Sequence, residues 1–260
     1  MTTAPLIEGF QQMDVRPRKR LILAVDALQK RGKTRFALTA PRPHAYINLD
    51  RGFESSADFD VEGVQIADIS GAMQKVVAGK GKLGEAALDP FKKHAEEALE
   101  LIVTRFRAAI NAGMRSVTID TATRWWEITR IARFGKIQQV SKEHYGPVKA
   151  EFEKWLYESM SCTSNIILLH RQRSEYVGDV KTNRFERAGY SDVQYIAQAS
   201  LELTRIPYEQ RGEGDLGFRA RITDCGTNPA ADGVELVNEE INFLNVALEV
   251  RPDSTPDVWM

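Results

Sequence analysis

Residues 18–34 read R-K-R-L-I-L-A-V-D-A-L-Q-K-R-G-K-T, and the interpretation of the whole chain depends on this stretch. The apolar run from Leu21 to Val25 is typical of a buried parallel strand. The segment after it ends in Gly32-Lys33-Thr34 and leads into residues 35–39, which can open a helix. A strand, a tight turn and a helix N-terminus in this order are the layout of a P-loop, where backbone N–H groups and the helix dipole attract phosphate.

This motif predicts a site for ATP and Mg²⁺. The Lys33 ammonium would reach the β- and γ-phosphates, and the Thr34 hydroxyl would hold Mg²⁺. The match to G-x-x-x-x-G-K-[ST] is imperfect, because Ala27 stands where a glycine usually turns the backbone with positive φ. From this stretch alone, a basic turn on a solvated surface is the alternative. The residues expected to surround the nucleotide are Ala27, Leu28, Gln29, Lys30, Arg31, Gly32, Lys33, Thr34 and Arg35.

The composition limits the class of protein. With 260 residues, 43% hydrophobic and 27% charged, the chain fits one large α/β domain. A net charge of −1 means that any nucleic-acid binding must come from a local patch. The two cysteines, Cys162 and Cys225, form no metal-ligand spacing. No apolar run is long enough to span a membrane and no signal peptide is recognisable, so we expect a cytoplasmic protein without a membrane partner.

The next predicted strand ends in acidic residues. Residues 44–49 read as a strand, and Asp50 and Glu54 follow it. This completes a β-α-β unit, in which ligands bind at the carboxyl edge of the sheet. We expect a loop with a short helix over residues 55–87, and a helix over residues 89–112 with an Asp-Pro start and Gly113 at its end.

A third strand over residues 115–120 ends in Asp120 and is followed by T-A-T. An acidic residue at the end of such a strand is typical of a Walker B motif, whose carboxylate would hold Mg²⁺ opposite Thr34. The alternative is a strand that merely ends on an aspartate capping the next helix. The preceding β-α-β unit favours the Walker B interpretation.

A fourth strand, residues 164–170, ends in His170, which could sense the γ-phosphate or couple it to the following loop. The alternative is a histidine with a purely structural role. The segment after it mixes basic and aromatic residues, as in loops that contact single-stranded nucleic acid, although a charged surface hairpin has the same composition. Either Arg171 or Arg173 could instead serve as an arginine finger for a neighbouring subunit. The nucleic-acid candidates are Arg171, Arg173, Tyr176, Lys181, Arg184, Phe185 and Arg187.

The C-terminal part is expected to complete the sheet with strands at 199–206, 218–224 and 241–250. The predicted fold is an α/β P-loop core with a mostly parallel central sheet flanked by helices, and with antiparallel strands toward the C-terminus. The predicted organisation is an N-terminal arm (1–17), a single core (18–250) and a flexible tail (251–260).

With these motifs in order, the chain resembles RecA-type core ATPases. It is most similar to the phage-encoded RecA-like AAA domain proteins, a group that includes the Sak-type single-strand annealing recombinases. The resemblance rests on A-L-Q-K-R-G-K-T, H-A-Y-I-N-L-D-R-G, S-V-T-I-D-T-A-T and I-I-L-L-H-R-Q-R, which span residues 18–225 with the intervening segments matching only in length and pattern.

The resemblance implies three roles. Asp50, with Glu54 as second choice, would activate the attacking water, and His170 would couple nucleotide state to the segment after it. Subunits would stack into a ring or filament with ATP between neighbours, in the host cytoplasm if the chain is phage-encoded. The chain departs from the family pattern at two positions. Ala27 replaces the usual glycine, and Asp50 stands where recombinases more often have glutamate.

The leading hypothesis is therefore an ATPase that binds single-stranded DNA in recombination, with a single-strand-binding protein as a further partner. A second hypothesis is a motor-accessory ATPase of the packaging or helicase-loader type. A third is a non-catalytic nucleic-acid-binding protein with a degenerate P-loop. Nucleotide binding separates the third from the others, and preference for single strands separates the first from the second.

Overall fold

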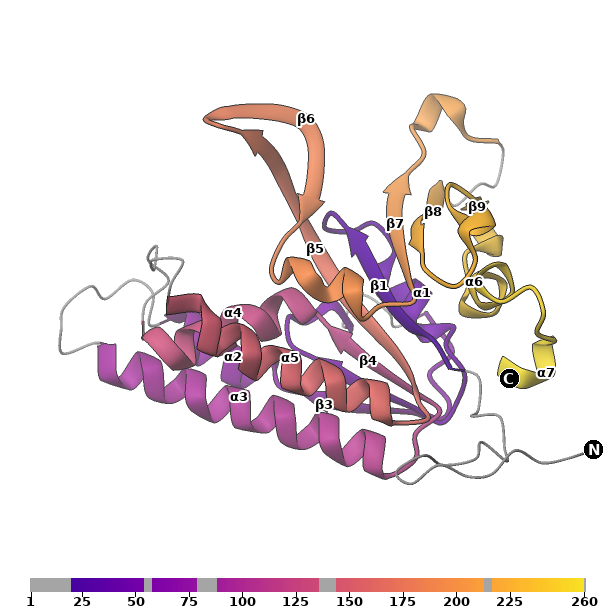
Figure 1. The fold of residues 1–260 in the computed structure, drawn as a ribbon. Coiled ribbons are helices and arrows are strands. Elements are labelled where there is room, and N and C mark those ends of the chain that lie inside the picture. The colour runs from indigo at the N-terminus through magenta and orange to yellow at the C-terminus, as the bar shows by residue number, and fades with distance from the viewer. Residues whose placement is uncertain (1–19, 54–57, 79–87, 136–143, 213–216, 260) are drawn as a thin grey trace, which may run out of the picture.

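A nine-stranded sheet forms the centre of the computed structural model, which describes residues 20–53, 58–78, 88–135, 144–212 and 217–259. The strand order is β3-β2-β4-β5-β1-β7-β8-β9, and β6 pairs with β5 outside this path (Figure 1). Neighbouring strands from β3 to β7 run parallel, whereas β8, β9 and β6 pair antiparallel with their partners. The prediction of a mostly parallel sheet with antiparallel strands toward the C-terminus is confirmed. The strands are β1 (Ile22–Ala27), β2 (His44–Asn48), β3 (Val64–Asp68), β4 (Ser116–Asp120), β5 (Asn165–Val177), β6 (Val180–Arg187), β7 (Ala199–Arg205), β8 (Phe218–Cys225) and β9 (Glu235–Val237).

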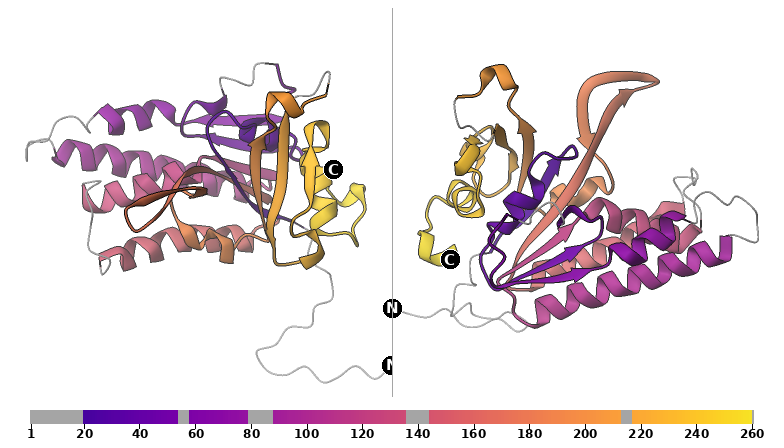
Figure 2. Two further views of the ribbon diagram at one scale, coloured as in Figure 1. Left: turned by 90° about the horizontal axis from the view of Figure 1, so that it is seen from above. Right: turned by 180° about the vertical axis from the view of Figure 1, so that it is seen from behind.

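Helices cover both faces of this sheet (Figures 1 and 2). One hydrophobic core joins the sheet to α2, α3, α4 and α5, and a second joins its other face to α1, α6 and α7. Successive side chains of β1 point to opposite faces of the sheet, so that both faces are apolar and need a covering layer. Ile22 and Ala24 enter the first core, and Leu23 and Val25 enter the second. The helices are α1 (Lys33–Leu38), α2 (Ser70–Ala78), α3 (Leu88–Asn111), α4 (Ala122–Phe134), α5 (Tyr145–Ser161), α6 (Phe243–Val250) and α7 (Pro256–Trp259).

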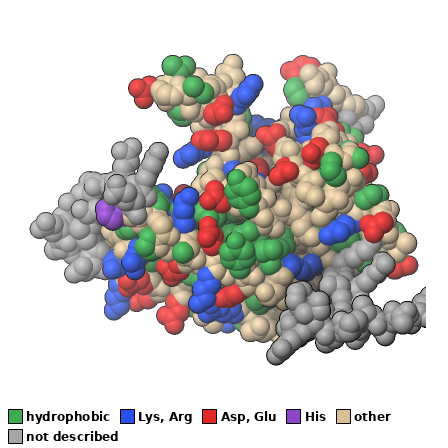
Figure 3. All heavy atoms as spheres, in the orientation of Figure 1, with side chains coloured by type: hydrophobic (Ala, Val, Ile, Leu, Met, Phe, Trp, Pro, Cys, Tyr) green, Lys and Arg blue, Asp and Glu red, His purple; other side chains and the backbone are tan. Residues whose placement is uncertain are grey.

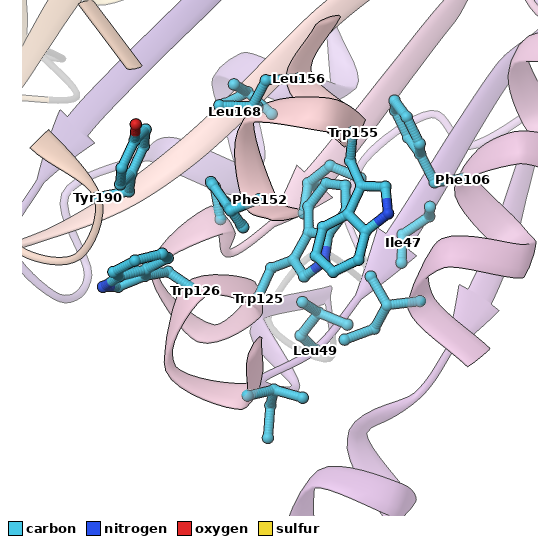
Figure 4. Packing of buried hydrophobic residues seen from close by; sticks show 14 of the residues in the cluster. Ile47, Leu49, Phe106, Trp125, Trp126, Phe152, Trp155, Leu156, Leu168 and Tyr190 are labelled. Atoms are coloured by element: carbon cyan, nitrogen blue, oxygen red, sulfur yellow. The ribbon is translucent and has the colours of Figure 1, made fainter. Parts of the chain in front are cut away.

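Aromatic side chains fill the first core where α4 and α5 meet the sheet (Figure 4). The rings of Trp125 and Trp155 are stacked, with centroids 5.4 Å apart. Phe106 from α3 and Phe152 from α5 pack against Trp125 at 5.4 and 5.3 Å. Each such pair adds about 0.5–1.5 kcal/mol to the stabilisation from buried area, so this cluster holds α4 against α3, α5 and β5.

The C-terminal part differs from the sequence-based expectation. Residues 241–250 do not form a strand: α6 occupies most of this range, and the last strand of the described chain is β9. The buried side chains of α6 recur at helical spacing, and the Asn242 side chain accepts a hydrogen bond from the Asn245 N–H at the start of the helix. The capping asparagine and this spacing together outweigh the β-propensity of a short apolar run.

The tail, expected to be flexible, is instead packed against the second core. Trp259 in α7 is 1% exposed, its indole N–H donates to Ser254 Oγ at 2.8 Å, and its ring lies edge-on to Phe243. Burial of so large a side chain holds these residues to the domain.

Two strands, β3 and the short β9, were not predicted. The expected short helix is present as α2, but β3 precedes it and forms the edge of the sheet beside β2. Both faces of β3 are at least partly exposed, so its sequence, V-Q-I-A-D, shows no clear alternation of apolar and polar residues. The predicted N-terminal arm lies outside the described residues.

Candidate active site

The predicted P-loop connects β1, in the middle of the sheet, to α1. Ala27 is the last residue of β1, and the left-handed backbone conformations fall at Lys30 (φ 59°) and Gly32 (φ 89°). The alanine therefore occupies extended backbone, where no glycine is needed. A Cβ at Gly32 would lie 3.3 Å from the Phe218 ring, so both the positive φ and the close approach favour glycine there.

The Lys33 ammonium turns back into this loop. Its Nζ donates to the carbonyl oxygens of Ala27 at 3.0 Å and Leu28 at 2.9 Å. Partial burial lowers the pKa of Lys33, while the charges of Asp120 and Asp50 oppose that shift. The ammonium thus lies against the backbone of the loop and interacts electrostatically with two carboxylates.

Asp120, at the end of β4, lies beside the P-loop although β5 separates β4 from β1 in the sheet. Thr34 Oγ1 donates to Asp120 Oδ2 at 3.3 Å, and the Tyr46 hydroxyl donates to the same oxygen at 2.5 Å. Asp120 is 2% exposed, and burial, with the nearby Asp50 charge, raises its pKa to about 6. The structure thus brings together Thr34 and Asp120, the two predicted Mg²⁺ ligands.

These two groups fit a magnesium ion. A hydroxyl and a carboxylate are the hard oxygen donors that Mg²⁺ prefers. Burial disfavours the charged form of Asp120, and a divalent cation beside it would stabilise that form. The donor set and its electrostatics therefore both suit the ion.

Glycine at position 52 makes this crowded arrangement possible. A Cβ on Gly52 would lie 2.6 Å from Asp120 Oδ2, and 3.3 Å from both Asp50 Oδ1 and Thr34 Oγ1. The segment after β2 can pass close to Asp120 only without a side chain at this position. Sequence reasoning missed both Gly52 and Tyr46.

Asp50 lies at the same edge and is paired with an arginine. Its side chain is 15% exposed, and Oδ2 accepts a hydrogen bond from Arg171 NH2 at 2.5 Å. Arg171, predicted to bind nucleic acid or to act on a neighbouring subunit, thus contacts a carboxylate of its own chain. Glu54, the second choice for water activation, lies outside the described residues.

His170 is completely buried in β5, opposite Asp26 of β1. Within the described part of the chain, neither ring nitrogen has a hydrogen-bond partner. Burial, together with the nearby Arg187 charge, lowers the pKa of His170 to about 3, so the ring is neutral near pH 7. A role in sensing the γ-phosphate stays a prediction.

The buried histidine predicts an acid-dependent loss of stability. Because the folded pKa is about 3 and the ordinary value is 6.5, the unfolded chain binds more protons between these pH values. The unfolding free energy should fall on acidification through this window, by up to about 1.4 kcal/mol per pH unit from this residue. Urea unfolding at several pH values should show that the unfolding free energy of His170→Leu depends less steeply on pH than that of the original protein. Equal slopes for the two proteins would contradict this prediction.

The β5–β6 hairpin projects from the carboxyl edge of the sheet (Figure 1). Arg173 is 67% exposed and pairs with Glu186 at 2.8 Å. Tyr176 and Phe185 are 59% and 47% exposed. Lys181 and Arg184 are also exposed, so five of the predicted nucleic-acid residues lie on the surface of the hairpin.

Arg187 does not lie on this surface, contrary to the prediction. Its guanidinium forms two hydrogen bonds with the Asp26 carboxylate, at 2.7 and 2.6 Å, and the side chains are 13% and 12% exposed. It also donates to Ser200 Oγ at 3.3 Å. Arg187 is the last residue of β6, where the hairpin returns to the sheet, and its ion pair joins β6 to β1.

The base of the hairpin is also fixed to the helix that follows Asp120. The Thr123 hydroxyl donates to the Ala188 carbonyl at 2.8 Å and accepts from the Arg171 N–H at 3.0 Å. The two strands of the hairpin are thereby joined to α4 at its first turn. No local sequence pattern indicates this contact, because it depends on the tertiary arrangement.

Comparisons with known proteins give a family and likenesses to solved structures. The model of a family described as AAA domain matches residues 20–213. No curated protein matches the chain. Among solved structures, the crystal structure of the RadB recombinase is similar at 14% identity and a TM-score of 0.41, covering 83% of this chain and 84% of that chain. None of the helices in the described ranges is long and apolar enough to cross a membrane.

Proposed function

The chain belongs to the AAA domain family, and from this premise we propose that it is a RecA-like P-loop ATPase that acts on single-stranded DNA in recombination. The observation that carries the ATPase assignment is the convergence of Lys33, Thr34 and Asp120 beside Asp50 at one edge of the sheet. We propose more specifically that it has a role like that of the phage Sak-type annealing proteins. Action in the cytoplasm remains a prediction.

Each residue of the site has a task in ATP hydrolysis. Lys33 would exchange its bonds to the Ala27 and Leu28 carbonyls for the β- and γ-phosphate oxygens. Thr34 and Asp120 would hold Mg²⁺, which neutralises phosphate charge when it is bound. Asp50 would orient the attacking water and accept its proton. The water oxygen bonds to the γ-phosphorus while the bond to the β–γ bridging oxygen breaks, giving ADP and phosphate.

Asp50→Asn tests the assignment of the base. The amide keeps the size of the side chain but cannot accept the proton, so kcat should fall by about 10²–10⁴-fold. Because Asp50 need not contact the ground-state phosphates, the affinity for a non-hydrolysable ATP analogue should stay within a few-fold of the original protein. Steady-state hydrolysis and calorimetric titration measure the two quantities. Unchanged kcat would remove Asp50 from the mechanism.

The exposed hairpin is the proposed contact for single-stranded DNA. In the space-filling view of Figure 3, it carries hydrophobic, acidic and basic side chains. Bases can stack on exposed aromatic rings such as Tyr176 and Phe185, while Arg184 and Lys181 can pair with phosphates. The whole chain has a net charge of −1, so it does not attract nucleic acid through its overall charge. Binding by the hairpin would therefore depend on these local basic and aromatic groups.

Replacing Arg184 and Phe185 together with alanine should weaken binding of a single-stranded oligothymidylate. Loss of stacking costs about 1–3 kcal/mol per base. Loss of one phosphate contact should reduce the slope of log K against log salt by about 0.7. Fluorescence anisotropy at several salt concentrations measures both effects, with Arg107→Ala on α3 as the control. An unaltered salt slope would place the DNA path elsewhere.

We also propose that copies of the chain assemble into a ring or filament with ATP between neighbours. Of the two candidate arginine fingers, Arg173 is the more exposed, at 67% against 37% for Arg171. Its guanidinium pairs with a half-exposed Glu186, so a neighbouring phosphate could compete for it. A single-strand-binding protein remains a further proposed partner.

A further inference from the structure

The ion pair between Asp50 and Arg171 joins the proposed catalytic carboxylate to the hairpin. The two groups lie 2.5 Å apart, with side chains 15% and 37% exposed. A carboxylate oxygen that accepts a guanidinium N–H has fewer lone pairs left for a water molecule. In this arrangement the Arg171 guanidinium competes with the attacking water for Asp50.

Arg171 is also the last residue of β5 that pairs with β1. It lies opposite Ala27, the last residue of β1, and the next residues of β5 pair with β6 instead. Its backbone N–H donates to Thr123, which fixes the backbone while the side chain remains partly open to solvent. The charged end of Arg171 can therefore change partners without any movement of the hairpin base.

A second arginine at the base of the hairpin provides a contrast. Arg187 makes two bonds to Asp26 and is only 13% exposed, so an incoming anion has little access to it. Within the described ranges, Arg171 makes one hydrogen bond to Asp50, and its side chain is nearly three times as exposed as that of Arg187. A planar guanidinium binds phosphate as readily as carboxylate, and Arg171 is the one of these two that a phosphate can reach.

We propose that Arg171 is a positioning residue that holds Asp50 away from the attacking water until a phosphate of single-stranded nucleic acid binds the guanidinium. Release of Asp50 then raises the rate of hydrolysis, so that strand binding on the hairpin and ATP turnover are coupled through one exchangeable ion pair. This inference rests on the proposed function, because it takes Asp50 as the group that activates water.

The test is ATP hydrolysis by the full chain carrying Arg171→Ala, with Mg²⁺ and with or without a single-stranded oligothymidylate. Without the oligonucleotide, kcat should rise on the order of tenfold toward the stimulated rate of the original protein, with the KM for ATP unchanged. The ratio of stimulated to basal rate should fall toward one. Arg171→Lys keeps a charge beside Asp50 and should retain a low basal rate.

Two further variants separate this effect from a general disturbance. Arg107 forms a partly exposed ion pair with Glu158 between α3 and α5, joined by two hydrogen bonds, and Arg107→Ala should leave both rates unchanged. In an Asp50→Asn background, Arg171→Ala should produce no gain, because the released carboxylate is gone. A gain that persists in that background would overturn the inference.

Other outcomes also overturn it in recognisable ways. A basal rate and stimulation ratio equal to those of the original protein would show that the ion pair has no influence on turnover. Rates lowered with and without the oligonucleotide would show that Arg171 itself contacts the nucleotide. If the original protein hydrolyses no ATP under either condition, the proposed function itself fails, and this inference fails with it. In the other outcomes the original protein still hydrolyses ATP, so that only the inference fails.

Discussion

Replacing Lys33 with alanine is expected to lower the affinity for ATP by about 10²-fold or more, because two charge-assisted hydrogen bonds to phosphate are worth about 1.5–3 kcal/mol each. The ammonium already lies within the P-loop, 2.9–3.0 Å from two backbone carbonyls. Alanine also removes a positive charge that interacts with the carboxylates of Asp120 and Asp50, so these carboxylates repel the phosphates more strongly. Calorimetric titration with a non-hydrolysable ATP analogue and Mg²⁺ measures the loss.

The control for this prediction is Lys75→Ala, which removes the same charge from the exposed face of α2. Its ATP affinity should equal that of the original protein. If Lys33→Ala binds the nucleotide equally well, residues 27–35 do not form the phosphate site. Loss of binding in both variants would point to a general effect of charge instead.

Replacing Arg187 with alanine is expected to reduce the unfolding free energy by about 3–5 kcal/mol, because it leaves the carboxylate of Asp26 buried without its partner. Both side chains are close to 12% exposed and share two hydrogen bonds of 2.6–2.7 Å. Equilibrium urea unfolding measures the change. Because this pair joins β6 to β1, the loss should also loosen the base of the hairpin.

Two comparisons sharpen this prediction. Arg173→Ala removes an arginine from the same hairpin but breaks only an exposed pair, and should cost about 0–1 kcal/mol. Replacing the pair together, as Asp26→Leu with Arg187→Met, should recover much of the stability, since no unpaired charge remains. Equal losses for Arg187→Ala and Arg173→Ala would contradict the structural role of the buried pair.

The central part of the fold could be predicted because it depends on local patterns. The apolar runs before Lys33, Asp50, Asp120 and Arg171 are long enough to identify buried parallel strands, and their carboxyl ends meet at one edge. Beyond this centre the patterns were ambiguous. The edge strand β3 lacks alternation, and the apolar run of α6 fits a strand as well as a helix until Asn242 is recognised as its cap.

The candidate site was predictable in its main residues but not in its contacts. Lys33, Thr34 and Asp120 lie together as their motifs indicated. Tyr46 could have been found, because alternation along β2 places it on the same face as Asn48, the residue of β2 that lies opposite Asp120. The contact of Gly52 with Asp120 and the ion pairs of the hairpin join residues far apart in the chain, and no local pattern specifies such partners.

Steady-state ATP hydrolysis with Mg²⁺, with and without single-stranded DNA, tests the central claim most directly. We predict hydrolysis that rises with the single strand, rises less with duplex, and disappears in Lys33→Ala. Equal stimulation by duplex would instead favour a motor-accessory ATPase. The absence of hydrolysis under all conditions would contradict the assignment of an ATPase to this chain.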